Sequence, residues 1–210
     1  MGEPELDRAL ELLSSSVLAE RCLGVDLLAT DPGARATEIL VSLLEETSWY
    51  LRERAVEALA SRSDALELIL EVLRRGPWFA RASACDVLGR REGKEAIVAI
   101  LEQVADRNVS LQRSAVAALR RIGESAGSTS VAERMAVLPP EHRARVLARI
   151  GHQEPTFAVV LDRALAGIPL ERFAKDEAQT RRSAEVDLHE ELALVRLRAL
   201  IAGAAHRDPT

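Results

Sequence analysis

The chain has 210 residues, of which 48% are hydrophobic, 29% charged and only 3% aromatic, a mixture that is typical of a folded helical protein and excludes a disordered one. Its net charge of −5 argues against a protein that coats nucleic acid. No apolar run approaches the roughly 20 residues that span a bilayer, and the acidic N-terminus lacks a signal-peptide core, so we expect a cytoplasmic protein without a membrane partner.

A repeat with a period near 30 residues organises the sequence. Leu59, Leu88 and Leu119 coincide when their flanking segments are superposed, which gives spacings of 29 and 31 residues. Leu28 and Leu147 fit the same frame, upstream and downstream. The superposed segments are residues 48–59, 77–88 and 108–119. Five repeated units are therefore predicted.

Each unit contains two predicted helices, because apolar residues recur at helical spacing in both halves. In the second helices the buried stripe is Leu51, Ala55 and Leu59 or their equivalents, and small residues such as Gly24 allow close helix approach. We expect first helices at residues 5–16, 34–46, 64–75, 94–106 and 131–138. Breaks are expected at residues 31–33, 76–77, 92–93, 123–129, 139–140 and 154–155. No segment alternates as a strand would, so the fold class is all-α.

Two segments carry a family resemblance. Leu51-Arg-Glu-Arg-Ala-Val-Glu-Ala-Leu59 and Leu111-Gln-Arg-Ser-Ala-Val-Ala-Ala-Leu-Arg-Arg-Ile-Gly123 resemble the second helix of bacterial HEAT repeats, in the short variety also found in phycobilisome lyases. The resemblance covers about residues 5–152. It implies a right-handed α-α superhelix of five to six helix pairs over residues 1–153, and it implies little about function because such solenoids serve unrelated roles.

The C-terminal part departs from the repeat. Residues 156–167 predict one more helix, and residues from about 174 to 205 predict a long charged helix with Leu188, Leu192 and Val195 on one stripe. Terminal units of a solenoid need an atypical cap. We therefore expect residues 154–205 to form a helical cap and 206–210 a tail. The alternative is that this helix pairs with another chain and makes an oligomer.

Charge divides between the two helix sets. The first helices of the first four units are net acidic, whereas the second helices are net basic from the second unit onward. Second helices line the concave face of HEAT-like solenoids, so the resemblance implies a basic groove that binds an acidic partner. Its candidate residues are Arg81, Arg90, Arg113, Arg120, Arg121, Arg145 and Arg149.

These arginines have structural alternatives. Arg52 and Arg81 hold equivalent positions at which repeat units often bond loop carbonyls or acids of the next unit. The later arginines also fit an ordinary solvated surface, on which single ion pairs contribute about 0–1 kcal/mol.

Aromatic pairs recur where two second helices begin, at Trp49-Tyr50 and Trp78-Phe79. One interpretation is core packing at the turn between helices. The other is an exposed edge whose tryptophans Trp49 and Trp78 anchor a partner.

Enzyme motifs are weak in this sequence. The four histidines and two cysteines have no metal-ligand spacing, so we expect no metal and no cofactor, and we interpret Cys22 and Cys85 as free buried thiols. Alkylation-repair DNA glycosylases are HEAT-like, and in that comparison Trp49, Trp78 and Asp86 would fill their tryptophan and catalytic aspartate roles. A phycobilin-lyase-like function is supported only by the repeat type.

The sequence therefore favours a non-catalytic scaffold whose basic concave face binds an acidic protein surface, helix or peptide. The alternatives are a HEAT-like nucleic-acid-binding protein or glycosylase and, second, a phycobilin-lyase-like protein.

Overall fold

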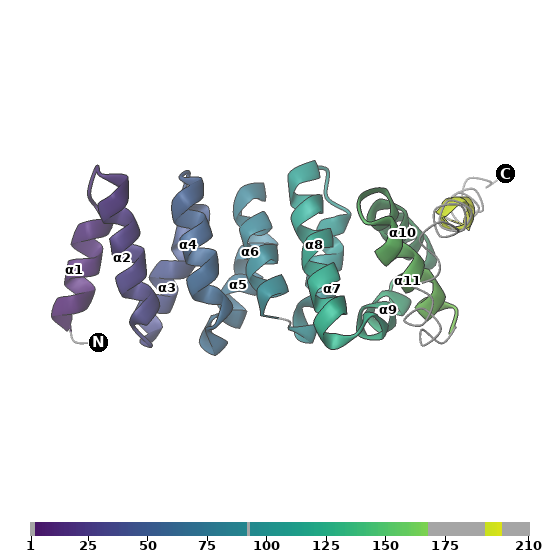
Figure 1. Cartoon of the computed structure of the whole chain (residues 1–210), viewed down its shortest axis with the longest axis horizontal. Coiled ribbons are helices and arrows are strands. Elements are labelled where there is room, and N and C mark those ends of the chain that lie inside the picture. The colour runs from purple at the N-terminus through teal and green to yellow at the C-terminus, as the bar shows by residue number, and fades with distance from the viewer. Residues whose placement is uncertain (1–2, 92, 168–191, 199–210) are drawn as a thin grey trace, which may run out of the picture. The chain divides into compact units, whose positions relative to one another are not determined.

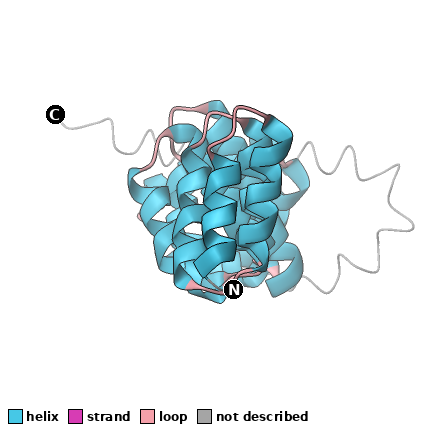
Figure 2. Cartoon of the chain, turned by 90° about the vertical axis from the view of Figure 1, so that its left-hand side faces the viewer, coloured by secondary structure: helices cyan, strands magenta, loops and turns pink. Residues whose placement is uncertain are grey.

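A computed structural model describes residues 3–91, 93–167 and 192–198 of the chain. Every regular element in this part is an α-helix or a short 3-10 helix, with no strand among the described residues (Figure 2). The predicted all-α class is therefore confirmed. No helix in the described ranges is long and apolar enough to cross a membrane. The chain divides into two compact units, Met1–Ala99 and Ile100–Thr210, which are taken separately below.

Unit 1 is built from antiparallel helix pairs (Figure 1). Its elements are α1 (Glu3–Leu13), α2 (Leu18–Thr30), α3 (Ala34–Ser42), η1 (Leu43–Glu45), α4 (Trp49–Ala60), η2 (Ser63–Ala65), α5 (Leu66–Arg75), α6 (Trp78–Arg90) and η3 (Lys94–Ala96). The point of division falls inside α7 (Ile97–Val104). Each predicted first helix of this unit is present, and the later ones begin or end in a 3-10 turn.

Unit 2 continues the alternation of first and second helices. Its elements are α8 (Val109–Ala126), α9 (Ser128–Ala136), α10 (Pro140–Gln153) and α11 (Pro155–Leu165), followed by helical residues 192–198. α8 contacts α9 and α10, and α11 packs against α9 and α10. Pro140 and Pro155 occupy the first position of their helices, where the missing N–H breaks no helical hydrogen bond.

The second helices of unit 1 bury the stripe that the repeat predicts. Leu51, Ala55 and Leu59 on α4 are fully buried, as are Leu28 on α2 and Leu88 on α6. α2 packs on α4, and α4 packs on α6. The repeated leucines therefore form the core between successive helix pairs.

Close approach of α1 to α2 depends on Gly24. A Cβ added there would lie 2.8 Å from the carbonyl oxygen of Ala9 and 3.1 Å from the backbone nitrogen of Leu13. Both atoms belong to the backbone and move only with their helix. This confirms the prediction that a small residue at this position lets the two helices approach.

One predicted break is present but shorter than expected. A loop was expected over residues 123–129, but α8 continues through Gly123 to Ala126, and Gly127 alone turns the chain with φ 89°. Gly123 is used for packing instead, since a Cβ there would lie 2.9 Å from Cε2 of Phe157 on α11. The glycine that suggested a loop is the place where the ring of Phe157 meets α8.

A buried polar network links successive helix pairs inside unit 1. The guanidinium of Arg62 is buried and donates to the carbonyl oxygens of Leu28 (3.3 Å) and Asp31, and to Oγ1 of Thr37 (2.9 Å). Arg91 in turn donates to the carbonyl oxygen of Arg62. Arg62 thus adds a donor to carbonyls at the C-terminal end of α2, and Arg91 bonds a carbonyl in the turn just after α4.

Most of the predicted C-terminal cap lies outside the described residues, as do Leu188 and the tail at 206–210. In the part that is described, Leu192 and Val195 are buried, and Leu192 Cδ2 lies 3.4 Å from the position of a Cβ on Gly151 of α10. Arg198 pairs with Asp162 of α11. The cap and the oligomer-forming helix both remain predictions.

Candidate interaction surface

The second helices of unit 1 all begin with a large apolar residue that is exposed. Leu18 starts α2, Trp49 starts α4 and Trp78 starts α6, and the residue before each has an extended backbone that ends the preceding loop. Trp49 is 59% exposed, Trp78 46% and Leu18 41%. These residues precede the first buried turn of their helices, so their side chains project beyond the core stripe.

These three helix starts lie at one edge of unit 1. Arg21 in the first turn of α2 pairs with Glu46, just before α4, at 2.9 Å. The guanidinium of Arg52, in the first turn of α4, lies 5.3 Å from the centre of the Phe79 ring at the start of α6. Figure 1 shows α2, α4 and α6 in sequence along unit 1.

Each aromatic pair packs edge to face. The rings of Trp49 and Tyr50 are 5.0 Å apart at 71°, and those of Trp78 and Phe79 are 5.8 Å apart at 89°. Tyr50 is 60% exposed, whereas Phe79 is half-buried under Arg52. We call Leu18, Trp49, Tyr50, Trp78 and Phe79 the aromatic edge.

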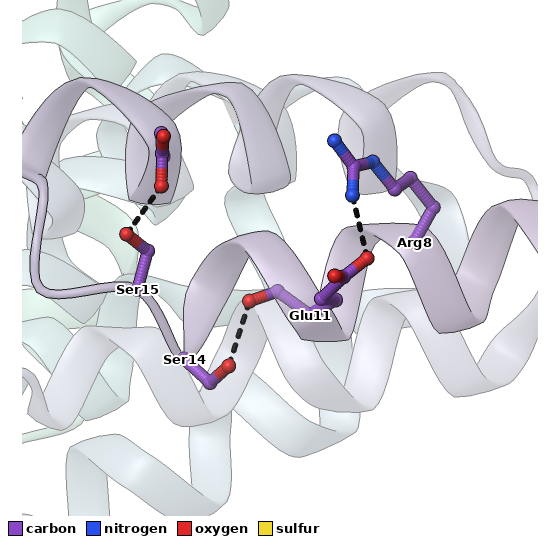
Figure 3. Close-up of polar contacts among 5 residues, drawn as sticks. Arg8, Glu11, Ser14 and Ser15 are labelled. Carbon is purple, nitrogen blue, oxygen red and sulfur yellow. Dashed lines mark hydrogen bonds and ion pairs between the residues drawn. The ribbon is translucent and has the colours of Figure 1, made fainter.

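The turn before Leu18 is fixed by serine hydroxyls. Ser14 Oγ donates to the carbonyl oxygen of Glu11 at 2.7 Å, which closes the end of α1 (Figure 3). Ser15 Oγ contacts the Glu20 carboxylate and accepts from the backbone N–H of Val17 at 3.0 Å. The polar turn thus holds Leu18 at the edge.

Of the two interpretations of the aromatic pairs, core packing does not describe Trp49, Tyr50 and Trp78, because all three side chains are exposed. Tryptophan and tyrosine are the residue types that dominate the binding energy of protein interfaces. A contiguous exposed patch of such side chains is typical of interaction sites.

Arg52 has the structural role that the repeat suggested. Its guanidinium donates to the carbonyl oxygens of Glu46 (2.5 Å) and Thr47 (2.9 Å), in the loop before α4. At the equivalent place in unit 2, Gln112 donates to the carbonyl oxygen of Asp106 at 2.5 Å. In α4 and α8 this position therefore stabilises the loop that precedes the helix.

Arg81, the other member of that set, is half-buried beside Cys85 on α6. Burial of the Cys85 thiol raises its pKa far above the ordinary range, Asp86 raises it further, and Arg81 partly opposes this. Cys85 is therefore a protonated core residue at neutral pH. Cys22 is also a free thiol and is half-buried, so it is more accessible than predicted.

Two of the candidate groove arginines are engaged by carboxylates of the same chain. Arg90 pairs with Glu53 and lies 3.9 Å from Glu57, both on α4. Arg120 pairs with Glu124 and lies 3.5 Å from Glu154. These contacts reduce the charge that either arginine presents to a partner.

The remaining arginines lie in unit 2 and differ from one another. Arg149 donates to the carbonyl oxygens of Val104 (2.9 Å) and Asp106 (3.0 Å), and Arg121 is half-buried with contacts of its own. Arg113 on α8 and Arg145 on α10 are exposed. Within the described ranges neither of these two makes an ion pair, so they are the accessible remainder of the predicted groove.

The glycosylase assignment needs Asp86 and the tryptophans to face one substrate. Trp78 begins α6 and Asp86 follows eight residues later, which places the two about 12 Å apart along the helix axis. Asp86 is half-buried among core residues of α6. The described residues also contain no group of three or more His, Cys, Asp or Glu side chains that could hold a metal ion. Nothing in this geometry points to catalysis by Asp86.

Comparison with known proteins does not identify a family. No family model matches the chain, and no curated protein matches it. Two engineered proteins of known structure are similar to it at 19% and 20% identity; each covers 96% of this chain, over 96% and 98% of its own length, with TM-scores of 0.38 and 0.35. Because both TM-scores are below 0.5, the HEAT-like assignment remains a resemblance carried by the repeated sequence.

Proposed function

We propose that this chain is a non-catalytic scaffold that binds another protein along the aromatic edge. The observation that supports this function is the exposure of Trp49, Tyr50 and Trp78 at the starts of two neighbouring helices. Burial of apolar surface releases about 25 cal/mol per Å², and these large rings offer such surface on a rigid frame that loses little entropy on binding.

The partner in this proposal carries acidic residues. The second helices are rich in arginine, and Arg113 and Arg145 are exposed in unit 2. Arg90, Arg120 and Arg149, which the sequence also suggested as binding residues, are held by groups of this chain and serve mainly its own stability. Nucleic acid is the less favoured partner, because several arginines are engaged internally and the net charge is −5.

We further propose that the repeats of this chain form a right-handed HEAT-like superhelix and that the protein acts in the cytoplasm. The spacing of the repeated leucines supports this, since Leu88 in unit 1 and Leu119 in unit 2 are 31 residues apart, as are Leu28 and Leu59 within unit 1. A stack of similar helix pairs buries the equivalent leucine in every repeat.

Affinity purification with matched variants tests the scaffold function. The tagged full chain, Trp49→Ala, Trp78→Ala and the control Val137→Ala are used to capture proteins from the source cells. Val137 is an exposed apolar residue of unit 2, outside the aromatic edge. We expect the parent and the control to capture the same protein. Either tryptophan variant should capture at least tenfold less of it, and the purified partner should bind the parent chain directly.

Circular dichroism of each variant establishes that it is folded. Equal capture by all four proteins would contradict binding at the aromatic edge. A gel-shift titration with DNA tests the rival function of nucleic-acid binding. A solenoid that binds nucleic acid would bind DNA at low salt, and its affinity would fall steeply as the salt concentration rises.

A further inference from the structure

The aromatic edge repeats along unit 1 with the period of its helices. Large apolar side chains recur at the first residue of α2, α4 and α6, which are Leu18, Trp49 and Trp78. Packed helices lie about 8–10 Å apart, so these anchors recur at about that interval. A linear partner that crosses the three helix starts needs an apolar group on one face at the same interval.

A polyproline II helix meets this requirement better than other regular conformations. It has three residues per turn and a rise of about 3.1 Å, so every third residue returns to one face after about 9.3 Å. A strand returns to one face after about 6.7 Å. An α-helix brings residues three or four positions apart to one face after about 5.4 Å, and residues seven positions apart after about 10.5 Å.

The polar groups of the edge also fit such a partner. Among the described residues, the indole N–H groups of Trp49 and Trp78 and the hydroxyl of Tyr50 have no hydrogen-bond partner. The backbone carbonyls of a polyproline II helix are not bonded within it and accept hydrogen bonds from such donors. Aromatic-lined surfaces of tryptophan and tyrosine bind proline-rich segments in this way.

Charge at the α6 end of the edge is positive. Arg74 and Arg75, which precede Trp78 in the chain, are 57% and 82% exposed, and both pair with the single carboxylate of Glu71 at 2.9 and 3.0 Å. The guanidinium of Arg52 is bonded to carbonyl oxygens rather than to a carboxylate. This end of the edge is therefore complementary to acidic residues.

We infer that the aromatic edge binds a proline-rich segment in polyproline II conformation that carries acidic residues. This inference rests on the proposed scaffold function and names its partner class. Prolines at every third position pack on Leu18, Trp49 and Trp78, and the acidic residues lie toward Arg74 and Arg75.

Peptide titration tests the inference on the unaltered full chain. The probes are a peptide with proline at every third position and glutamate between, the same composition with its prolines grouped, a version with lysine in place of glutamate, and an acidic amphipathic helical peptide. Trp49 and Trp78 are the only tryptophans of the chain, so their fluorescence reports directly on the site. We expect the first peptide to shift the emission and to bind at least tenfold more tightly than each of the other three.

Calorimetry extends the test to variants. Trp49→Phe, which keeps a ring but removes the indole N–H, should weaken the first peptide about threefold to tenfold, Trp78→Ala more than tenfold, and Val137→Ala not at all. The inference is overturned if proline spacing has no effect, if the lysine version binds as well, or if the helical peptide binds more tightly. If the peptides fail while partner capture still depends on the aromatic edge, only the partner class is wrong. If capture does not depend on the edge, the scaffold function fails as well.

Discussion

At the residue scale, the structure distinguishes side chains that sequence reasoning treated alike. Arginine is abundant on the second helices, and the sequence suggested one basic surface. The contacts separate arginines that satisfy carbonyls, such as Arg52 and Arg149, from those paired with carboxylates, such as Arg90, and from the exposed Arg113. Charge counts along a helix do not reveal these differences, because partners come from other elements.

Arg62 was missed, although the sequence holds a signal for it. Arg62 and Arg91 each follow the repeated leucine by three residues, with the same spacing of 29 as Leu59 and Leu88. A charged residue that repeats in register with core leucines indicates a structural position. Its burial confirms that role.

We expect Arg62→Met to lower the free energy of unfolding by about 2–3 kcal/mol. The substitution removes hydrogen bonds of a charged group and leaves the carbonyl oxygens of Leu28 and Asp31 without that donor. Urea unfolding followed by tryptophan fluorescence measures this, since both tryptophans lie in unit 1. The matched control is Arg35→Met, an exposed arginine whose ion pair among the described residues is with Glu38, which should change stability by less than about 0.5 kcal/mol. Equal effects would show that the buried network contributes nothing.

The raised pKa of Cys85 predicts a loss of stability at alkaline pH. The folded thiol stays protonated, whereas the unfolded thiol ionises above its ordinary pKa of about 8.5. The unfolded state therefore binds fewer protons and is stabilised relative to the folded state as pH rises, so the free energy of unfolding falls. By pH 9.5 this amounts to about 1.4 kcal/mol. Urea unfolding at pH 7.5 and 9.5 should show the loss in the parent, and a smaller one in Cys85→Ala. An equal loss in both proteins would show that the folded thiol also ionises.

At the element scale, the sequence predicted the helices well because apolar periodicity and proline breaks act locally. The predicted break over residues 123–129 lies at Gly127 rather than at Gly123, which shows where local signals fail. A glycine marks either a turn or a close contact, and only the position of Phe157 on another helix decides between them. The sequence alone could not decide whether the aromatic pairs are buried or exposed, because their exposure depends on where the starts of neighbouring helices lie.

Two glycine substitutions should have opposite effects. Gly24→Ala places a methyl group 2.8 Å from a backbone oxygen, so it should destabilise unit 1 by about 1–3 kcal/mol despite the gain in helix propensity. Gly151→Ala meets only ordinary contacts at 3.4 Å, so it should be neutral or stabilise unit 2 by up to about 1 kcal/mol. Fluorescence reports on the first and circular dichroism on the second. A stabilising Gly24→Ala would contradict the close packing of α1 on α2.

At the scale of the whole molecule, the repeat predicts coupling between the two units. In a continuous solenoid, neighbouring repeats stabilise one another, so a core substitution in unit 2 should also weaken unit 1. Leu119→Ala removes a fully buried side chain of α8 and should cost about 2–5 kcal/mol. We expect the fluorescence transition, which reports on unit 1, to shift together with the circular dichroism transition. The prediction is contradicted if the fluorescence midpoint of unit 1 is unchanged while circular dichroism shows a separate, earlier transition. The two units would then unfold independently.

The most direct test of the central claim, that the aromatic edge binds a partner, is site-specific photo-cross-linking in the source cells. A benzophenone amino acid replaces Tyr50 in one protein and Val137, a more exposed position outside the edge, in the other. We predict a discrete adduct with a single partner protein from position 50 and none from position 137. The claim is contradicted if position 50 gives no adduct, or if both positions give the same ones.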